Sequence, residues 1–327
     1  MQKDRGNQGM EVYHGVDAFQ PPGRPVFLAL GMFDGVHRGH QHLVRSLLER
    51  SRRMGGFAVV STFDPHPLKV LSSPSYPFLL TTLEERLSLL ERLGIDAVLI
   101  FPFTQTFRQI SPEAFIQEIL VAKLGVREVF VGPHHTFGRD RRGNVDLLRR
   151  MGETLGFLVH VVEPLSVEGT LVSSSFIRDL LRRGEVDVAN KFLGRYYSLR
   201  GVVVAGERRG SELGYPTANL LPPEDKLIPG NGVYAGVASL SQERFPAVIN
   251  VGVRPTFGGQ RLVVEAHLLD FQGEIYGQHI DLAFVKRLRD EQKFVNPGAL
   301  AAQIAQDISL ARESLHDLLA KADPLSE

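Results

Sequence analysis

The chain of 327 residues contains no cysteine. This absence excludes disulfides, thiolate catalysis and a zinc site with cysteine ligands, and it is compatible with a reducing cytoplasm. No apolar run approaches the roughly 18 residues of a membrane span. The polar start, MQKDRGNQGMEVYHG, lacks the apolar core of a signal peptide. We therefore expect a soluble cytoplasmic protein with no membrane partner.

The chain also lacks an excess of either charge, because 37 Lys and Arg residues stand against 37 Asp and Glu residues. A nucleic-acid-binding surface needs a basic excess, so we expect no nucleic acid partner. The length is comfortable for two domains and long for one. The oligomeric state stays open between a monomer and weak self-association.

The stretch VFLALGMFDGVHRGHQHL combines a strand, a turn and a helix start. Residues 26–30 are all apolar or small, which predicts a strand buried on both faces. Gly31 and Gly35 indicate a turn, and His37 and His40 follow it on the same side of the first helical turn. A helix N-terminus attracts anions, and two imidazoles there can donate hydrogen bonds to phosphoryl oxygens. The stretch therefore predicts phosphate chemistry.

A metal pair and ordinary surface histidines are the alternatives for these two residues. No Gly-Lys-Ser/Thr follows the glycines, and the dinucleotide fingerprint is absent. The pattern G-x-F-D-G-x-H-x-G-H resembles the nucleotidylyltransferase superfamily and, in its longer form, the bacterial bifunctional riboflavin kinase/FAD synthetases. The resemblance implies that His37 and His40 are catalytic, binding the triphosphate of ATP during attack on its α-phosphorus. It implies ATP contacts by Gly31, Phe33, Asp34, Gly35 and Gly39.

Strands alternate with helices through the first half of the chain, which predicts a parallel sheet with helices on both faces. With the resemblance, this predicts an α/β nucleotidylyltransferase-type (Rossmann-like) domain over residues 1–190. The predicted strands after the first are 57–63, 97–101, 128–131 and 157–162, and the predicted helices include 83–93, one that starts at Ser111, and 143–155.

Polar groups follow two of these strands, at the edge where open α/β sheets bind ligands. Asp64 and His66 follow the second strand. The loop VGPHHTFGRDRRGN follows the fourth, and its arginines suit phosphate, with a solvated basic loop as the alternative. The resemblance places this loop at the flavin and nucleotide, with His134 where the family usually has Asp or Asn. We assign flavin binding to Asp64, His66, His134 and Phe137.

A run of hydroxyls, VSSSFIR, begins the next predicted helix. On its own it is an N-cap, although such hydroxyls also bind phosphate. It resembles the second ATP element of the family, SS(S/T)xIR, which implies ATP contacts by Ser173, Ser174, Ser175 and Arg178. The family often has an arginine two residues before the first serine, where this chain has Leu171.

Beyond residue 197, short β-rich segments separated by Gly or Pro turns predict a small antiparallel barrel. A helix over 297–319, with apolar residues at helical spacing, is expected to pack on it. With the resemblance to the bifunctional family, we assign residues 191–327 to a riboflavin kinase β-barrel domain with its C-terminal helix. The predicted strands are 199–205, 232–240, 247–253, 262–269 and 280–286.

A second motif, GERRGSELGYPTAN, lies inside the barrel region. Its glycines allow close approach to a ligand, and the side-chain oxygens of Thr217 and Asn219 suit Mg²⁺, which shares its ligands with phosphates and water. A plain turn is the alternative for PTAN. The pattern resembles the riboflavin kinase module, which implies Mg²⁺ at Thr217 and Asn219. The implied ATP contacts are Gly206, Gly210, Gly214, Thr217 and Asn219.

A kinase that acts on a hydroxyl needs a group that accepts its proton. Strand alternation puts Glu265 and His267 on one face, with an exposed strand carboxylate as the alternative for the glutamate. The resemblance implies that Glu265 is the catalytic base. The segment LRDEQKF matches a flavin-side loop of the family, so we assign flavin binding to Arg289 and Glu291.

The resemblance covers residues 26–315, with five motifs in the family's order. It implies two reactions: ATP phosphorylates riboflavin to FMN, and a second ATP adenylylates FMN to FAD and pyrophosphate. A monofunctional riboflavin kinase with an impaired first module, which His134 and Leu171 favour, is one alternative. A non-catalytic flavin-binding regulator is another. A nucleotidylyltransferase for a different alcohol phosphate would leave the barrel motif unexplained.

Overall fold

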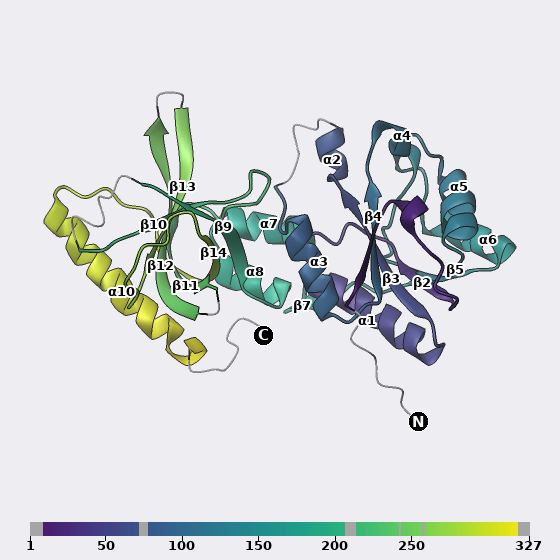
Figure 1. Ribbon diagram of the computed structural model, residues 1–327, viewed down its shortest axis with the longest axis horizontal. Coiled ribbons are helices and arrows are strands. Elements are labelled where there is room, and N and C mark those ends of the chain that lie inside the picture. Colours follow the sequence, from purple (N-terminus) through teal and green to yellow (C-terminus); the bar gives the residue numbers. More distant parts are fainter. Residues whose placement is uncertain (1–8, 72–77, 207–213, 242, 257–258, 320–327) are drawn as a thin grey trace. The chain divides into compact units, whose positions relative to one another are not determined.

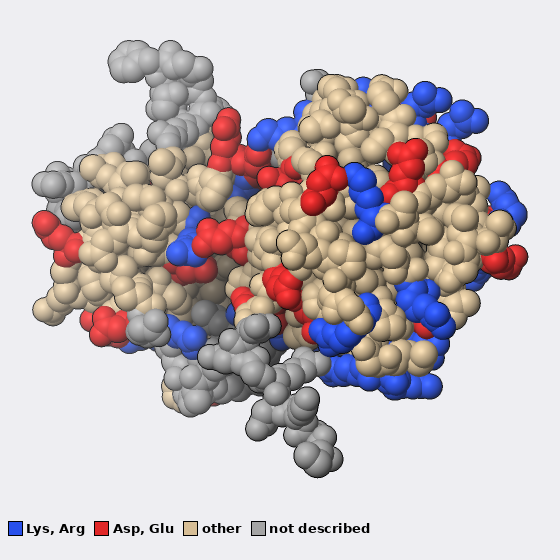
Figure 2. Space-filling view, turned by 45° about the vertical axis from the view of Figure 1, so that its right-hand side comes forward, with Lys and Arg blue, Asp and Glu red and all other residues tan. Residues whose placement is uncertain are grey.

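The computed structural model describes residues 9–71, 78–206, 214–241, 243–256 and 259–319. Backbone packing divides the chain into two units, Met1–Val172 and Ser173–Glu327, and each unit is described by itself. Within the described ranges, no helix has the length and apolar character needed to cross a membrane. Basic and acidic side chains both occur across the face shown in Figure 2, in keeping with equal numbers of the two charges.

A six-stranded sheet in the order β1-β4-β3-β2-β5-β6 forms the centre of the first unit, and every neighbouring pair is parallel. After β2 the chain builds the sheet in one direction through β3 and β4, and then in the other through β5 and β6. The point of reversal, between β2 and β5, is where such sheets bind ligands at the carboxyl ends of their strands. The strands are β1 (Glu11–His14), β2 (Val26–Ala29), β3 (Phe57–Asp64), β4 (Ala97–Pro102), β5 (Val126–Val131) and β6 (Leu158–Val161).

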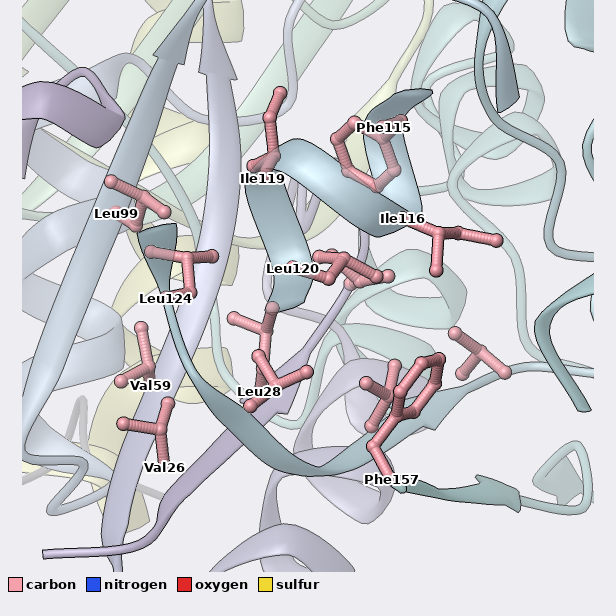
Figure 3. Close-up of a cluster of buried hydrophobic side chains, with 14 of the residues drawn as sticks. Val26, Leu28, Val59, Leu99, Phe115, Ile116, Ile119, Leu120, Leu124 and Phe157 are labelled. Carbon is pink, nitrogen blue, oxygen red and sulfur yellow. The ribbon is translucent and has the colours of Figure 1, made fainter. Parts of the chain in front are cut away.

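Helices cover both faces of this sheet (Figure 1), as expected for parallel strands with apolar side chains on both sides. On one face, Leu28 and its neighbours meet Ile119 and Leu120 of the segment η2 (Phe115–Lys123), as Figure 3 shows. On the other face, Phe27 packs with Val44 and Leu47. The face of Phe27 is covered by α1 (Arg38–Arg53) and α3 (Leu83–Arg92). The face of Leu28 is covered by η2 and α6 (Val145–Leu155), and the short helix α5 (Pro112–Ala114) leads directly into η2.

One buried charge fixes α1 against the sheet. Glu128 of β5 is 1% exposed and accepts two hydrogen bonds from Arg50 of α1, both 2.8 Å long. The ring of His160 lies 2.6 Å from the same carboxylate. Burial alone would raise the pKa of Glu128, but the bonds from Arg50 and His160 outweigh it and lower that pKa. The helix that begins with the histidine motif is therefore held to β5 near its far end.

Short elements complete the first unit. Two of them, α2 and α4, follow the carboxyl ends of β3 and β4, and η3 lies in the loop after β5. The remaining elements are η1 (Val16–Ala18), α2 (Pro67–Val70), α4 (Gln105–Arg108), η3 (Arg139–Arg141), β7 (Ser166–Val167) and β8 (Thr170–Leu171).

The second unit is a closed barrel in the order β10-β13-β12-β11-β14-β9, with every pairing antiparallel. Two short helices precede it, and α8 is tied to it by Asn190, which donates to the carbonyl of Phe284 at 2.9 Å and accepts from the N–H of Tyr197 at 2.7 Å. The elements are α7 (Ser174–Arg182), α8 (Val186–Leu193), β9 (Tyr197–Val204), β10 (Ala218–Leu221), β11 (Gly232–Leu240), β12 (Glu243–Thr256), β13 (Gly259–Leu268), β14 (His279–Arg289) and α10 (Pro297–Leu319).

The C-terminal helix α10 packs on the barrel as predicted. Ala311 and Leu315 are fully buried against side chains of β11 and β12. An ion pair fixes its angle, because Arg289 of β14 donates two hydrogen bonds, 2.9 and 2.8 Å long, to the carboxylate of Asp307. Since Asp307 is 2% exposed, this bidentate pair is largely shielded from water.

The predicted fold class is confirmed: a parallel α/β sheet domain is followed by a small antiparallel barrel with a C-terminal helix. Four strands were not predicted, of which β7 and β8 span two residues each. The edge strand β1 is mostly exposed and has no apolar run, and β10 spans only four residues directly after a proline-containing turn. The proposed domain boundary between residues 190 and 191 stays a prediction.

Candidate active sites

The turn that follows β2 is strained. Phe33, Gly35 and Val36 have φ values of 52°, 86° and 38°, and the N–H of Val36 donates to the carbonyl of Phe33 at 3.1 Å. Two of the three are not glycine, and each such residue costs about 1–3 kcal/mol. Glycine suits the positive φ at position 35, and a Cβ there would stand 2.8 Å from the side chain of Leu80. A Cβ on Gly31 would likewise stand 2.8 Å from the ring of Phe33.

Asp34 holds this turn in place from inside. Its carboxylate is 1% exposed and accepts hydrogen bonds from the backbone N–H groups of Leu80 at 3.1 Å and Thr81 at 3.0 Å. The hydroxyl of Thr81 donates to the same carboxylate at 3.0 Å and accepts from the N–H of Gly35 at 2.9 Å. Asp34, which we predicted to contact ATP, is thus bonded to the segment before α3.

Arg86 of α3 is the counter-charge below Asp34. It is 2% exposed, its guanidinium lies 3.8 Å from the carboxylate, and it donates to Thr62 at 2.8 Å. The hydroxyl of Thr62 donates in turn to the carbonyl of Met32 at 2.7 Å. β3, α3 and the turn are therefore joined by a buried ion pair and two hydrogen bonds, which become stronger out of water.

The two histidines lie at the start of α1. His37 is the N-cap, and its Nδ1 accepts from the N–H of His40 at 3.2 Å. A nitrogen that accepts carries no hydrogen, so the neutral ring of His37 has its proton on Nε2 and can donate from there. The two rings stack, with centroids 3.6 Å apart and planes at 14°, and Phe33 packs on His40 at 5.0 Å. A Cβ on Gly39 would stand 3.2 Å from the His37 ring, so this residue lets the ring fold back over the helix.

Aromatic side chains gather at the carboxyl ends of β3 and β4, and sequence reasoning missed them. Phe63 lies 5.8 Å from Phe103 and 5.9 Å from Phe107, all three half-buried. Asp64 at the end of β3 is exposed beside them, and His66 is half-buried. Half-exposed aromatic rings beside a few polar groups suit a flat aromatic ligand. The phenylalanines carry no motif, so only the sheet topology brings them together.

The two residues of the loop after β5 that we assigned to the flavin differ in their exposure to solvent. His134 is exposed, whereas Phe137 is 9% exposed and packs on Phe115 at 5.5 Å. Phe137 also pairs with Gly143 through two backbone hydrogen bonds, so its ring is part of the core beneath the proposed flavin site. Burial lowers the pKa of the neighbouring His135 to about 4.

The serine run begins α7. The hydroxyl of Ser173 caps the helix by accepting from the N–H of Phe176 at 3.3 Å. Ser173 and Ser175 are exposed, Ser174 is half-buried, and Arg178 is 6% exposed. These residues begin the second unit, whereas the two histidines lie in the first.

Three polar side chains occupy opposed positions on neighbouring strands of the barrel. Glu265 of β13 lies in register with Asn219 of β10 on one side and with Asn250 of β12 on the other. Directly opposed residues of neighbouring strands project on the same face. Asn219 is 7% exposed, and a Cβ on Gly206 would stand 2.1 Å from its amide nitrogen. Of the other glycines in this motif, Gly214 is exposed with φ of 85°, and Gly210 lies outside the described residues.

His267 ties the PTAN segment to β13. Its Nδ1 lies 2.7 Å from the carbonyl of Pro216, and because a carbonyl only accepts, Nδ1 carries the proton. The ring of Tyr215 meets His267 edge-on at 5.7 Å. Thr217, half-buried, follows this anchor and leads into β10. The histidine thus positions the residues that we assigned to Mg²⁺.

The two residues assigned to the flavin-side loop differ in their contacts. The guanidinium of Arg289 is bonded to Asp307 of α10, which makes it an anchor of that helix. Glu291 is exposed, and a Cβ on Gly252 would stand 2.2 Å from its carboxylate. In the part of the chain that the structure describes, no group of three or more His, Asp or Glu side chains could hold a metal ion.

A stacked imidazole pair at a helix N-terminus of a parallel α/β sheet, followed by a barrel with a cross-strand Asn–Glu pair, defines a two-domain transferase of phosphorus groups. The family model of FAD synthetase matches residues 20–176, and that of riboflavin kinase matches residues 193–315. The chain belongs to the family of bifunctional riboflavin kinase/FMN adenylyltransferases.

Individual relatives agree with this assignment. The bifunctional riboflavin kinase/FMN adenylyltransferase of Escherichia coli K12 is 37% identical over 295 residues, which cover 90% of this chain and 94% of the relative. That of Bacillus subtilis 168 is 35% identical, covering 86% and 89%. A crystal structure described as a macrolide-efflux protein from Streptococcus pneumoniae has a TM-score of 0.85 and 29% identity, covering 93% of this chain and 99% of the other.

Proposed function

We propose that the chain phosphorylates riboflavin with ATP to FMN in the barrel, and adenylylates FMN with a second ATP to FAD and pyrophosphate in the α/β unit. The observation that carries the proposal is the presence of both sites in one chain: the stacked His37–His40 pair and the Asn219–Glu265 pair. Both activities appear in the names of relatives that span nearly the whole chain. The remaining alternatives would leave one of the two sites without a role.

In adenylyl transfer, a phosphate oxygen of FMN attacks the α-phosphorus of ATP, and pyrophosphate leaves. Negative charge grows on oxygens that His37 can reach through its Nε2–H, with His40 stacked beside it and the positive end of α1 behind both. The strained turn and its buried anchor fix these donors before the substrate arrives, so no reorganisation is needed during the reaction.

The serine run completes the proposed ATP site. Ser173, Ser174 and Ser175 lie within residues 20–176, the range that the FAD synthetase model matches together with the histidine motif. This supports contacts from Ser173 and its neighbours Ser174 and Ser175 to the phosphates of ATP. Arg178 would then stabilise that site through its charge, one turn into α7.

In the kinase reaction, Glu265 accepts the proton of the ribityl 5′-hydroxyl as that oxygen attacks the γ-phosphorus of ATP, and ADP leaves as the bond from the γ-phosphorus to the bridging oxygen breaks. Asn219, which lies opposite this carboxylate, and Thr217, which directly precedes β10, offer neutral oxygens, a donor set that fits Mg²⁺ when phosphates and water supply the remaining ligands. A bound Mg²⁺ would neutralise charge on the phosphates. The register between β10 and β13 fixes the distance between the proposed base, Glu265, and the proposed metal ligand Asn219.

The flavin of the second step would lie at the carboxyl edge of β3 and β4. Phe63, Phe103 and Phe107 offer half-exposed rings for the isoalloxazine, with Asp64, His66 and His134 at the polar rim. Phe137 supports this surface from below through Phe115. We further propose a cytoplasmic location, no nucleic acid partner, and a domain boundary between residues 190 and 191.

The experiment is a time course of purified protein with riboflavin, ATP and Mg²⁺, with products separated by chromatography. FMN should rise and then give way to FAD. His40→Ala should stop the reaction at FMN, and Glu265→Gln should abolish FMN formation while FAD still forms from added FMN. FMN alone from the unaltered chain would indicate an impaired adenylyltransferase, and bound riboflavin without product would indicate a flavin-binding regulator.

A further inference from the structure

Three arginines of the first unit line one cavity. Arg139 and Arg142 of the loop after β5 and Arg150 of α6 border a cavity of about 270 Å³ near the start of α6. Within the described ranges, none of the three guanidinium groups has a hydrogen-bond acceptor or an ion-pair partner. Arg141, in the same loop, does have one: it donates to the hydroxyl of Thr136 at 3.0 Å. In a chain with balanced charge, three uncompensated arginines around one cavity indicate an anionic ligand.

The loop that carries two of these arginines is fixed to the domain rather than solvated freely. The N–H of Arg139 donates to the carbonyl of Ile110 at 2.7 Å, and a Cβ on Gly138 would stand 2.8 Å from the backbone of Pro112. Asp140 and Arg141 have φ values of 56° and 58°, in the left-handed region that non-glycine residues avoid. The loop thus keeps a strained shape that places Arg139 and Arg142 on the cavity wall.

The other polar groups of the wall present donors. The hydroxyl oxygen of Ser111 accepts from the N–H of Ala114 at 3.1 Å, and Oδ1 of Asn144 accepts from the N–H of Leu147 at 2.9 Å. Because their acceptor atoms cap helices, the Ser111 O–H and the Asn144 amide N–H groups remain for a ligand. Glu113 is the one carboxylate on the wall, against three arginines. Phosphate oxygens, which only accept and bind arginine in a bidentate manner, match this set of donors.

We propose that this cavity binds an oligophosphate at a site separate from the histidine pair. The histidines begin α1, which packs on one face of the sheet, whereas α6, which lines the cavity with Leu147 and Arg150, packs on the other. A cavity of this volume accommodates a diphosphate-sized anion, either free pyrophosphate or the phosphate tail of a nucleotide. The choice between these two sources rests on the proposed function, which releases the first and consumes the second, but binding itself does not require turnover.

The test is calorimetric titration of the full chain with pyrophosphate in the absence of metal. Arg142→Gln and Arg150→Gln should each weaken one binding event about tenfold or more, the usual effect of losing a charge-assisted hydrogen bond. Arg149→Gln is the matched control, because Arg149 is exposed on the same helix but does not line the cavity. His37→Ala should leave this event intact. The proposal would be overturned if all four variants bound pyrophosphate as tightly as the unaltered chain does. It would also be overturned if there were a single binding event and His37→Ala removed it.

Two further measurements separate the possible outcomes. If ATP competes with pyrophosphate for the site, the ligand is the phosphate tail of a nucleotide. If ATP does not compete, the ligand is free pyrophosphate. Both results support the site. FAD formation is measured independently by chromatography. Arginine-dependent binding of pyrophosphate without FAD formation would refute the proposed function and support the site. FAD formation without such binding would support the proposed function and refute the site.

Discussion

The two candidate sites differ in the backbone structure that positions their reacting groups: a strained turn in the α/β unit and a regular pair of strands in the barrel. In the α/β unit, the histidines follow a turn with two non-glycine residues in the left-handed region, and that turn is held by Asp34 and Arg86 from below. In the barrel, Glu265 and Asn219 occupy opposed positions of an ordinary antiparallel ladder. A turn must be fixed by side chains distant in sequence, whereas a ladder fixes itself through its register. Damage to the first site should therefore come from remote residues, and damage to the second from the reacting residues themselves.

The largest effect should come from Arg86→Met. It leaves the buried carboxylate of Asp34 without its counter-charge, which costs about 3–5 kcal/mol of stability. FAD formation from FMN should be nearly lost, while phosphorylation of riboflavin continues. Urea unfolding and separate assays of the two steps would measure this. Arg86→Lys, which keeps the charge, is the control, and normal FAD formation by Arg86→Met would show that the turn needs no buried anchor.

In the barrel, Asn219→Leu should lower riboflavin phosphorylation roughly 10- to 100-fold, the effect of removing a hydrogen-bonding group from charged partners. Adenylylation of added FMN should be unchanged. Asn219→Asp keeps an oxygen at the position and should retain more activity at raised Mg²⁺. Equal losses in both steps would mean that the barrel residue also serves the first unit.

Acid should affect the first unit through His135, whose folded pKa is about 4. The unfolded chain binds a proton from about pH 6.5 downward, and the folded chain does so only near its lower pKa, so stability falls as the pH drops between these values. The loss should reach about 2 kcal/mol near pH 5. Urea midpoints at neutral and acid pH would show this slope, and His135→Phe should reduce it. An unchanged slope in that variant would assign the acid sensitivity to other groups.

The smallest effect should come from Gly35→Ala, which forces alanine into a left-handed conformation at a cost of about 1–2 kcal/mol. Gly206→Ala is the matched change in the barrel, since its Cβ would meet the amide of Asn219. The first variant should lower only FAD formation and the second only FMN formation. Initial rates of both steps would check this, and a crossed result would break the comparison between the two sites.

The fold was largely predictable because its signals are local. Strand β11 was predicted with the bounds that the structure shows, Gly232–Leu240, from its β-rich composition between turns. Helix α10 was predicted over its full length from the spacing of its apolar residues. Strand β10 was not, because four residues after a proline turn carry too short a pattern to distinguish from a loop.

The candidate sites were predictable only where motif residues act directly. The sequence indicated His37, but its stacking on His40 and the proton on Nε2 follow from an N-cap that only the folded chain displays. Arg86 gave no signal, because a single arginine on an amphipathic helix is ordinarily solvent-exposed. Its burial depends on Asp34, 52 positions earlier in the chain, and no pattern within one segment links the two.

The closure of the barrel has a consequence for amide hydrogen exchange. Every barrel strand is paired on both sides, so no edge can fray and the six strands should exchange their amides together. The open sheet of the first unit ends in β1 and β6, each paired on one side only, and Leu158 of β6 is 54% exposed. Exchange in that unit should therefore spread inward from its two edges, reaching β2, which leads into the histidine turn, last.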